Sequence, residues 1–208
     1  MGLISNGTTI FDAGALDSGL AKGAMTFIKK LTASSSGTLT FHNGASSVVL
    51  DNTYKEYLFT FKDIHPSATS GNPVFSFQGN AVGESGYNEA ITSTHIRCAN
   101  YEDDSDRYLS YGQGKDQAQG TSFQSLVDGD TGGDNDQSLA GYLHLFDPSN
   151  TTFLKHYIAK THTSAANDVA TTVFNAGYFN TTAAIDEIQF KMSTGNIDVG
   201  DICLYGIS

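Results

Sequence analysis

Alternation of apolar and polar side chains is clearest near the C-terminus. Residues 188–192 (Ile-Gln-Phe-Lys-Met) alternate strictly, which is the period-two pattern of a half-buried strand. Gly195-Asn196 follows and supplies the backbone freedom that a tight turn needs. Residues 202–207 (Ile-Cys-Leu-Tyr-Gly-Ile) are apolar on both parities, which is typical of a strand buried on both faces. The pattern therefore predicts two strands joined by a turn.

Similar segments recur upstream from residue 25. In the segment 54–64, Tyr57, Phe59 and Phe61 share one face, and His65-Pro66 ends the strand. Together with the two terminal strands, the pattern predicts roughly ten strands. The upstream ranges are 25–33, 37–42, 54–64, 73–79, 121–127, 138–146, 152–161 and 169–179, and shorter candidates lie at 90–99 and 107–111.

The predicted fold class is all-β, because no segment shows a convincing amphipathic helical period. Short strands separated by turn signals indicate an antiparallel, jelly-roll-like β-sandwich. The chain shows no internal repeat and no linker within residues 25–208, so we expect one sandwich domain there. We also expect residues 25–33 to lie beside residues 200–207.

Residues 1–24 differ from the rest of the chain. Glycines interrupt every possible helix, and the apolar side chains are sparse and without period. One interpretation is a disordered leader. The other, which we favour, is an extended attachment arm that orders on another subunit. Its predicted apolar anchors are Leu3, Ile4, Ile10, Phe11, Leu16 and Leu20.

The composition restricts the function classes. The net charge of −11, with 11 Lys+Arg against 22 Asp+Glu, repels phosphate groups and argues against nucleic-acid binding. No stretch approaches the about 20 apolar residues that cross a bilayer, so no membrane partner is expected. The start of the chain also lacks the basic and apolar pattern of a signal peptide. Cys98 and Cys203 leave two alternatives open, a pair of free thiols or one disulfide.

Catalytic motifs are missing from the sequence. The six histidines form neither HExxH nor HxH, and no GxSxG nucleophile elbow is present. The acidic residues concentrate in apparent loops rather than on strand faces, so no acid/base pair can be assigned. We therefore expect no enzyme, no catalytic residue and no cofactor.

An acidic, glycine-rich loop is the weak candidate for a metal site. Ca²⁺ takes six to eight oxygen ligands, which flexible carboxylate loops can supply. The spacing does not match an EF-hand, so a solvated surface loop is the competing interpretation. The candidate ligands are Asp128, Asp130, Asp134 and Asp136.

Aromatic residues are abundant, with 13 Phe and 10 Tyr, while Trp is absent. Exposed aromatic platforms are common in sugar-binding sandwiches, and the missing Trp weakens that interpretation. The best candidates for an exposed aromatic set are Tyr101, Tyr108 and Tyr111, which lie near the acidic segment 102–106.

Three segments resemble a family of small virion proteins from tailed bacteriophages, best represented among marine and cyanobacterial phages. The terminal run 184–207 resembles the family ending I-D-x-I-x-F-x-x-S-x-G-N-I-D-x-G-x-I-x-L-Y-G-I. Residues 50–61 are similar to its D-x-T-Y-K-x-Y-x-F strand, and residues 141–153 to its G-x-L-x-L-F-x-P-x-x-x-T hairpin. The likeness covers most of residues 50–207 and does not include the arm.

The resemblance implies a structural β-sandwich on the outer surface of a virion. The leading expectation is a capsid decoration (cement) protein that stabilises the head through subunit contacts. Its partners would be the major capsid protein or other virion proteins, and it would form a homo-oligomer, with a trimer favoured. The alternative is a tail fibre or spike protein that binds a host surface glycan. The short arm has no heptads or fibre repeat, which argues against a long fibre.

Overall fold

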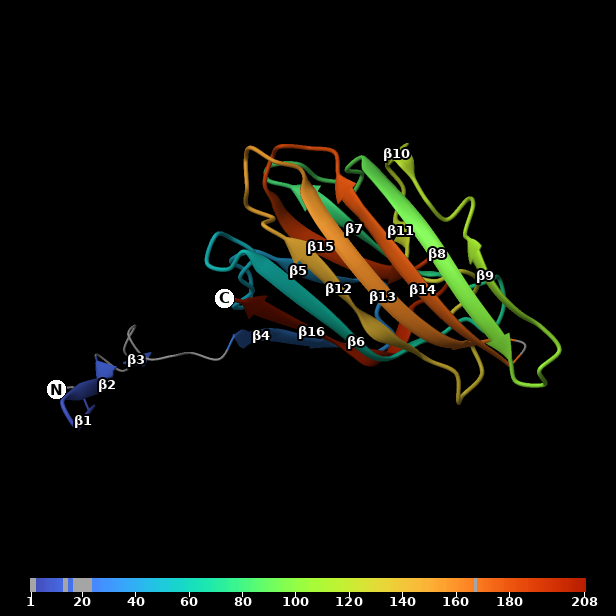
Figure 1. The fold of residues 1–208 in the computed structure, drawn as a ribbon, viewed down its shortest axis with the longest axis horizontal. Helices are drawn as coiled ribbons and strands as arrows, with labels where there is room; N and C mark the ends of the chain where they lie inside the picture. Colours follow the sequence, from blue (N-terminus) through green and yellow to red (C-terminus); the bar gives the residue numbers. More distant parts are fainter. Residues whose placement is uncertain (1–2, 13–14, 17–23, 167) are drawn as a thin grey trace.

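The computed structural model describes residues 3–12, 15–16, 24–166 and 168–208 (Figure 1). Every regular element in these residues is a β-strand, and all strand pairs are antiparallel. Across the same residues, no helix has the length and apolar character needed to span a membrane. The predicted all-β class is therefore confirmed.

Nine strands form the large sheet, in the order β10-β8-β14-β13-β12-β6-β16-β4, with β9 paired to β8. Their bounds are β4 (Met25–Thr32), β6 (Glu56–Pro66), β8 (Ile91–Tyr101), β9 (Arg107–Tyr111), β10 (Ala118–Gly120), β12 (Leu139–Phe146), β13 (Lys155–Ala165), β14 (Val169–Phe179) and β16 (Ile197–Ile207).

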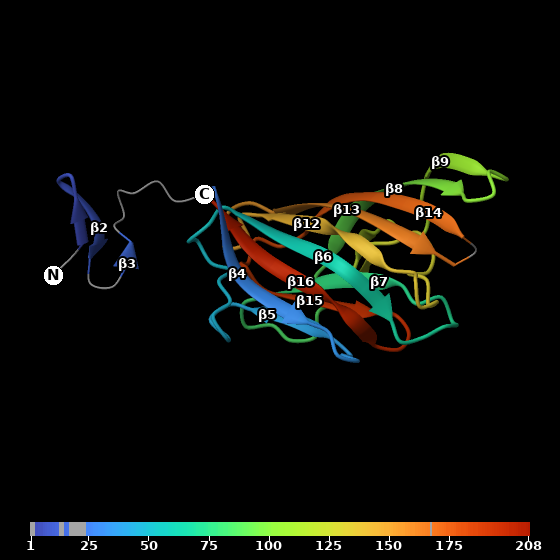
Figure 2. The ribbon, with the colours of Figure 1, turned by 90° about the horizontal axis from the view of Figure 1, so that it is seen from below.

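Four strands form the small sheet, in the order β11-β7-β15-β5. Their bounds are β5 (Leu39–His42), β7 (Phe75–Ala81), β11 (Gln124–Ser125) and β15 (Ile185–Met192). Figure 2 shows this sheet lying against one face of the large sheet, which makes the two-layer sandwich. The sandwich is thus confirmed, while the jelly-roll topology stays a prediction.

The core lies between the two sheets and is rich in phenylalanine. The side chains of Tyr57, Phe59 and Phe61 on β6 are buried on one face, as the alternation predicted. Phe190 on β15 packs among phenylalanines of both sheets, and its ring stacks on Phe75 with centroids 5.8 Å apart. Burial of these large apolar surfaces is the main stabilising contribution to the fold.

The two ends of the sandwich domain pair as expected. In β4 and β16, Met25 lies opposite Ile207 and Leu31 opposite Ile202. The two terminal strands, however, do not pair with each other, because β15 belongs to the small sheet and β16 to the large one. The turn between them crosses from one layer to the other. It is held by Ser67, whose backbone N–H donates to the Asn196 carbonyl over 2.9 Å.

A small separate sheet is formed by β1 (Leu3–Ser5), β2 (Thr8–Asp12) and β3 (Ala15–Leu16). The interpretation as an extended arm missed this pairing. Ser5 lies opposite Thr8, and Asn6 and Gly7 between them both have positive φ, as a two-residue hairpin turn requires. The Asn6-Gly7 pair is the sequence feature that indicates this hairpin.

Five of the six predicted apolar anchors lie on these three strands, and one lies outside the described residues. Ile4 on β1 is 63% exposed. Leu20 lies outside the described residues. The other four have backbone positions on the strands: Leu3, Ile10, Phe11 and Leu16. Whether they bind a partner stays a prediction.

Candidate functional site

The face of the large sheet turned away from the small sheet is unusually apolar, and we call it the outer face. The strand registers align its side chains in two rows that cross the sheet. The first row is Phe27, Tyr205, Leu58, His144, Ile158, Ala176 and Thr94. The second row is Lys30, Cys203, Thr60, Tyr142, Lys160, Phe174, Ile96 and Tyr111.

Large apolar side chains in these rows are open to solvent. Their exposed fractions are 56% for Phe27, 43% for Ile96, 50% for Tyr111, 39% for Tyr142, 49% for Ile158 and 46% for Phe174. Neither row contains a carboxylate, although the chain carries a net charge of −11. Carboxylates lie beside the rows and not within them: Asp201 pairs with Lys30 over 3.2 Å, and Asp116 accepts a hydrogen bond from Tyr111 over 2.7 Å. Contiguous apolar surface of this kind typically marks an interaction site.

Two shallow hollows interrupt the outer face. The larger, of about 500 Å³, is lined mainly by Phe146, Ile158, Ala176 and Tyr178. The smaller, of about 350 Å³, lies beside Leu58, Thr60, Gly141, Tyr142 and His144. Projecting rings thus alternate with depressions of side-chain size, which is the relief that shape-complementary interfaces use.

The outer face is hard to recognise from the amino-acid sequence for a clear reason. Residues 202–207 were interpreted as buried on both faces because they are apolar on both parities. The structure buries Ile202 and Leu204 in the core, whereas Cys203, Tyr205 and Ile207 point outward and are only half-buried. The apolar residues at the odd-numbered positions of this strand therefore indicate the exposed outer face, not a second buried layer.

A polar groove of about 300 Å³ is the second candidate site, at the far end of the large sheet. Two of the three predicted tyrosines, Tyr101 and Tyr108, line it together with Lys115, Asp128 and Asp130. The third, Tyr111, lies on the outer face, where its hydroxyl donates to Asp116 over 2.7 Å. The aromatic set predicted at 101–111 is thus divided between two surfaces.

Arg97 organises one wall of this groove. Its guanidinium pairs with the carboxylate of Asp128 and lies 5.1 Å from the ring centre of Tyr108. The hydrogen bond to Asp128 raises the pKa of Arg97, so the guanidinium stays charged. Burial raises the pKa of Tyr108, so its hydroxyl stays protonated. Arg97 thus fixes Tyr108 and Asp128 in the groove wall, and Tyr101, Lys115 and Asp130 remain as the other lining groups.

The four aspartates of the predicted calcium loop are not brought together. Asp128 pairs with Arg97, and Asp130 accepts a hydrogen bond from the Ala166 backbone N–H. The backbone of Asp134 interacts with Gln137 and His65, and Asp136 lines a different depression. Among all the described residues, no group of three or more His, Cys, Asp or Glu could hold a metal ion. The four carboxylates therefore do not form a common ligand set in this structure, and calcium binding by the loop stays a prediction.

Both cysteines are free. Cys98 lies on β8 and Cys203 on β16, and four strands separate these two in the large sheet. Five strand spacings correspond to about 24 Å, far beyond the about 7 Å between Cα atoms that a disulfide allows. The sheet order therefore decides in favour of free thiols.

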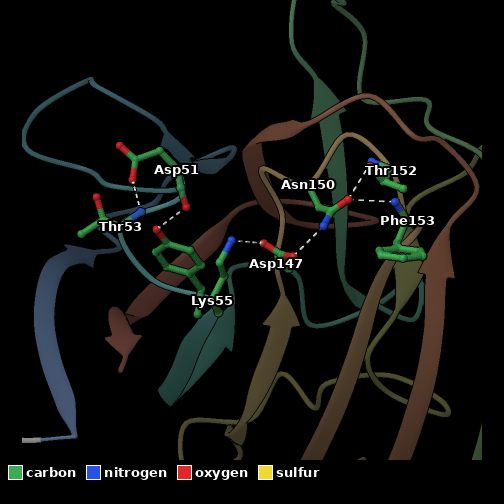
Figure 3. Close-up of polar contacts among 8 residues, drawn as sticks. Asp51, Thr53, Lys55, Asp147, Asn150, Thr152 and Phe153 are labelled. Carbon is green, nitrogen blue, oxygen red and sulfur yellow. Dashed lines mark hydrogen bonds and ion pairs between the residues drawn. The ribbon is translucent and has the colours of Figure 1, made fainter.

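Residues 50–55 and 147–153, far apart in the sequence, lie side by side at one end of the sandwich (Figure 3). Lys55 pairs with Asp147 over 3.1 Å, and Asn150 donates to the same carboxylate over 2.8 Å. The side-chain oxygen of Asn150 accepts hydrogen bonds from the backbones of Thr152 and Phe153. The hydrogen bond from Asn150, with help from Lys55, lowers the pKa of Asp147. These motif residues thus fix two loops.

Replacing Asn150 by alanine tests this structural role. Asn150→Ala removes three hydrogen bonds and should lower the free energy of unfolding by about 1–3 kcal/mol. Urea unfolding measures the loss. The neighbouring Thr151→Ala, at an exposed position, is the control and should change stability by less than about 0.5 kcal/mol. Equal stability of both variants would contradict the assigned role.

The fold and these surfaces define a two-layer antiparallel β-sandwich with one exposed apolar face and one polar groove. No protein-family model, curated protein or solved structure matches the chain.

Proposed function

We propose that this chain is a structural protein of a tailed-phage virion, a capsid decoration (cement) protein on the outer surface of the particle. Its partners are the major capsid protein or other virion proteins, and it acts as a homo-oligomer, with a trimer as the sequence-based expectation. The observation that carries the proposal is the outer face. A monomer that exposes so much apolar surface is best accounted for by an assembly that covers it.

The physics of the proposed role is association rather than chemistry. Burial of apolar area contributes roughly 25 cal/mol per Å², so a covered sheet face can hold neighbouring subunits together. The acidic charge on the remaining surface fits a particle that must stay dispersed and must not bind nucleic acid. The loop-fixing role of the shared motif residues agrees with a rigid, passive scaffold.

Attachment to the particle is assigned to residues 1–24 in this proposal. Deleting them should leave a soluble, folded body that no longer attaches to particles stripped of the protein. Cosedimentation with such particles is the measurement, and the full-length chain is the control. Circular dichroism of the truncated chain shows whether the body stays folded. Attachment of the truncated chain at full-length levels would refute the assignment.

The polar groove favours an alternative, a tail fibre or spike protein that binds a host surface glycan. Tyr101 supplies an aromatic ring, and Asp130, Asn72 and Lys115 supply polar groups, which together suit a neutral saccharide. The location on the particle separates the two functions. Antibody labelling over the whole head supports decoration, whereas labelling confined to the tail supports the alternative.

A further inference from the structure

We propose that the outer face of the large sheet binds the outer face of a second copy of this chain. The inference rests on the proposed function and names the partner of the same surface, and a two-fold pair here replaces the sequence-based expectation of a trimer. It does not depend on attachment through residues 1–24. Its arguments are the size of the face, its charge and its relief.

The face is large enough for a stable pair. The second row crosses eight strands, from Lys30 on β4 to Tyr111 on β9. Strands about 4.8 Å apart give it a width of about 34 Å. A third row flanks these two rows. It contains Met25, Ile207 and Phe146 at one end and His156 and Tyr178 further along. Three rows about 7 Å apart then cover about 700 Å², close to the about 800 Å² per partner of a standard interface.

Charge favours a second copy on this face over contact elsewhere. Two copies that each carry −11 repel wherever their carboxylates meet. The two apolar rows have no carboxylate, so they can approach with little repulsion. The face also carries both signs, Lys160 in the second row and Glu56 in the third row. A two-fold axis can therefore place the lysine of one copy near the glutamate of the other.

The shape of the outer face is also complementary to a second copy of the same face. The rings of Phe174 and Tyr142 project from the second row, and the larger hollow opens beside Ala176 and Ile158 in the first row. In a two-fold interface each projection meets a depression on the other copy, so one patch must hold both, as this one does. A trimer would need two different patches in a head-to-tail contact.

The test introduces a carboxylate on the face. Phe174→Glu replaces an exposed ring of the second row, and Phe153→Glu makes the same change at an exposed loop position that is 70% open and off the face. The mass of each variant, of the unchanged chain and of the chain without residues 1–24 is measured by analytical ultracentrifugation over a range of concentrations. Circular dichroism confirms that each variant is folded.

We expect the unchanged chain to form a dimer and Phe153→Glu to do the same. Phe174→Glu should weaken the dimer at least 100-fold, because each added carboxylate would be buried without a partner against the apolar hollow of the other copy. Ile158→Glu is a second variant in case Phe174→Glu does not fold. A monomeric unchanged chain, or an oligomer that survives both substitutions, would overturn the inference.

Two further results would show what covers the outer face instead of a second copy. If only the chain without residues 1–24 associates, that segment covers the face and the inference is wrong. If the unchanged chain is monomeric in solution but binds stripped particles, and Phe174→Glu abolishes that binding, a capsid subunit occupies the face. The proposed function would then stand while the inference fell.

Discussion

Phe190→Ala should lower the free energy of unfolding by about 3–5 kcal/mol, which is the range for removing a large aromatic side chain from a packed core. The Phe190 side chain has no solvent exposure. Its ring centre lies 5.5 Å from that of Phe59, 5.3 Å from that of Phe61 and 5.8 Å from that of Phe75. These partners come from both sheets, so the substitution leaves a cavity where the two layers meet.

Urea unfolding of the unchanged chain and the variant measures the difference. The matched control is Phe153→Ala, which removes the same ring from an exposed loop and should cost less than about 0.5 kcal/mol. A loss below about 1 kcal/mol for Phe190→Ala would mean that the phenylalanine cluster is not the centre of the core.

The second large effect is a loss of stability in acid that depends on His95. Its side chain is fully buried on β8, and Nδ1 lies 3.3 Å from the side-chain nitrogen of Asn175. Burial lowers the pKa of His95 to about 4, opposed by the nearby Asp128 carboxylate and reinforced by Lys115 and Arg97. The native state therefore keeps this imidazole neutral.

The sign of the effect follows from the lowered pKa. Between pH 6.5 and pH 4 the unfolded chain binds a proton at His95 and the native chain does not. The stabilising contribution is therefore complete above pH 6.5 and is lost as the pH falls through this window. For one such group, the free energy of unfolding should fall by about 2 kcal/mol between pH 7 and pH 4.5.

His95→Gln keeps a polar side chain and removes the proton-binding group. The two proteins need not be equally stable at pH 7, because the comparison is between the changes in their free energy of unfolding from pH 7 to pH 4.5. Denaturant unfolding at both pH values should show a fall smaller by about 2 kcal/mol in the variant. The exposed His156, replaced in the same way, is the control. Identical pH dependence of all three proteins would show that His95 is not kept neutral by the fold.

Much of the sandwich could be predicted because its determinants are local. The alternation at 57–61 and at 188–192 is visible along the chain and decides which side chains enter the core. The Asn6-Gly7 hairpin was also visible and was overlooked, because apolar residues around it are sparse and drew the interpretation toward an extended arm.

The candidate sites depended on contacts between distant segments. Arg97 and Asp128 are brought together by β8 and a loop that share no local pattern, and the four loop aspartates diverge although they are close in sequence. The free state of Cys98 and Cys203 follows from the number of strands between them. Spacing along the chain carries none of this information.

The amino-acid sequence by itself determined that the chain is built of short strands, because period-two burial is visible along it. The tertiary structure decided that the first and last strands of the sandwich lie side by side, because pairing between distant segments leaves no local pattern. Only the tertiary structure decided which of two apolar strand faces is buried. The second layer has four strands and the first has nine, and the small sheet packs against one face only. The apolar residues on the opposite face, from Phe27 to Ile96, are therefore left on the surface.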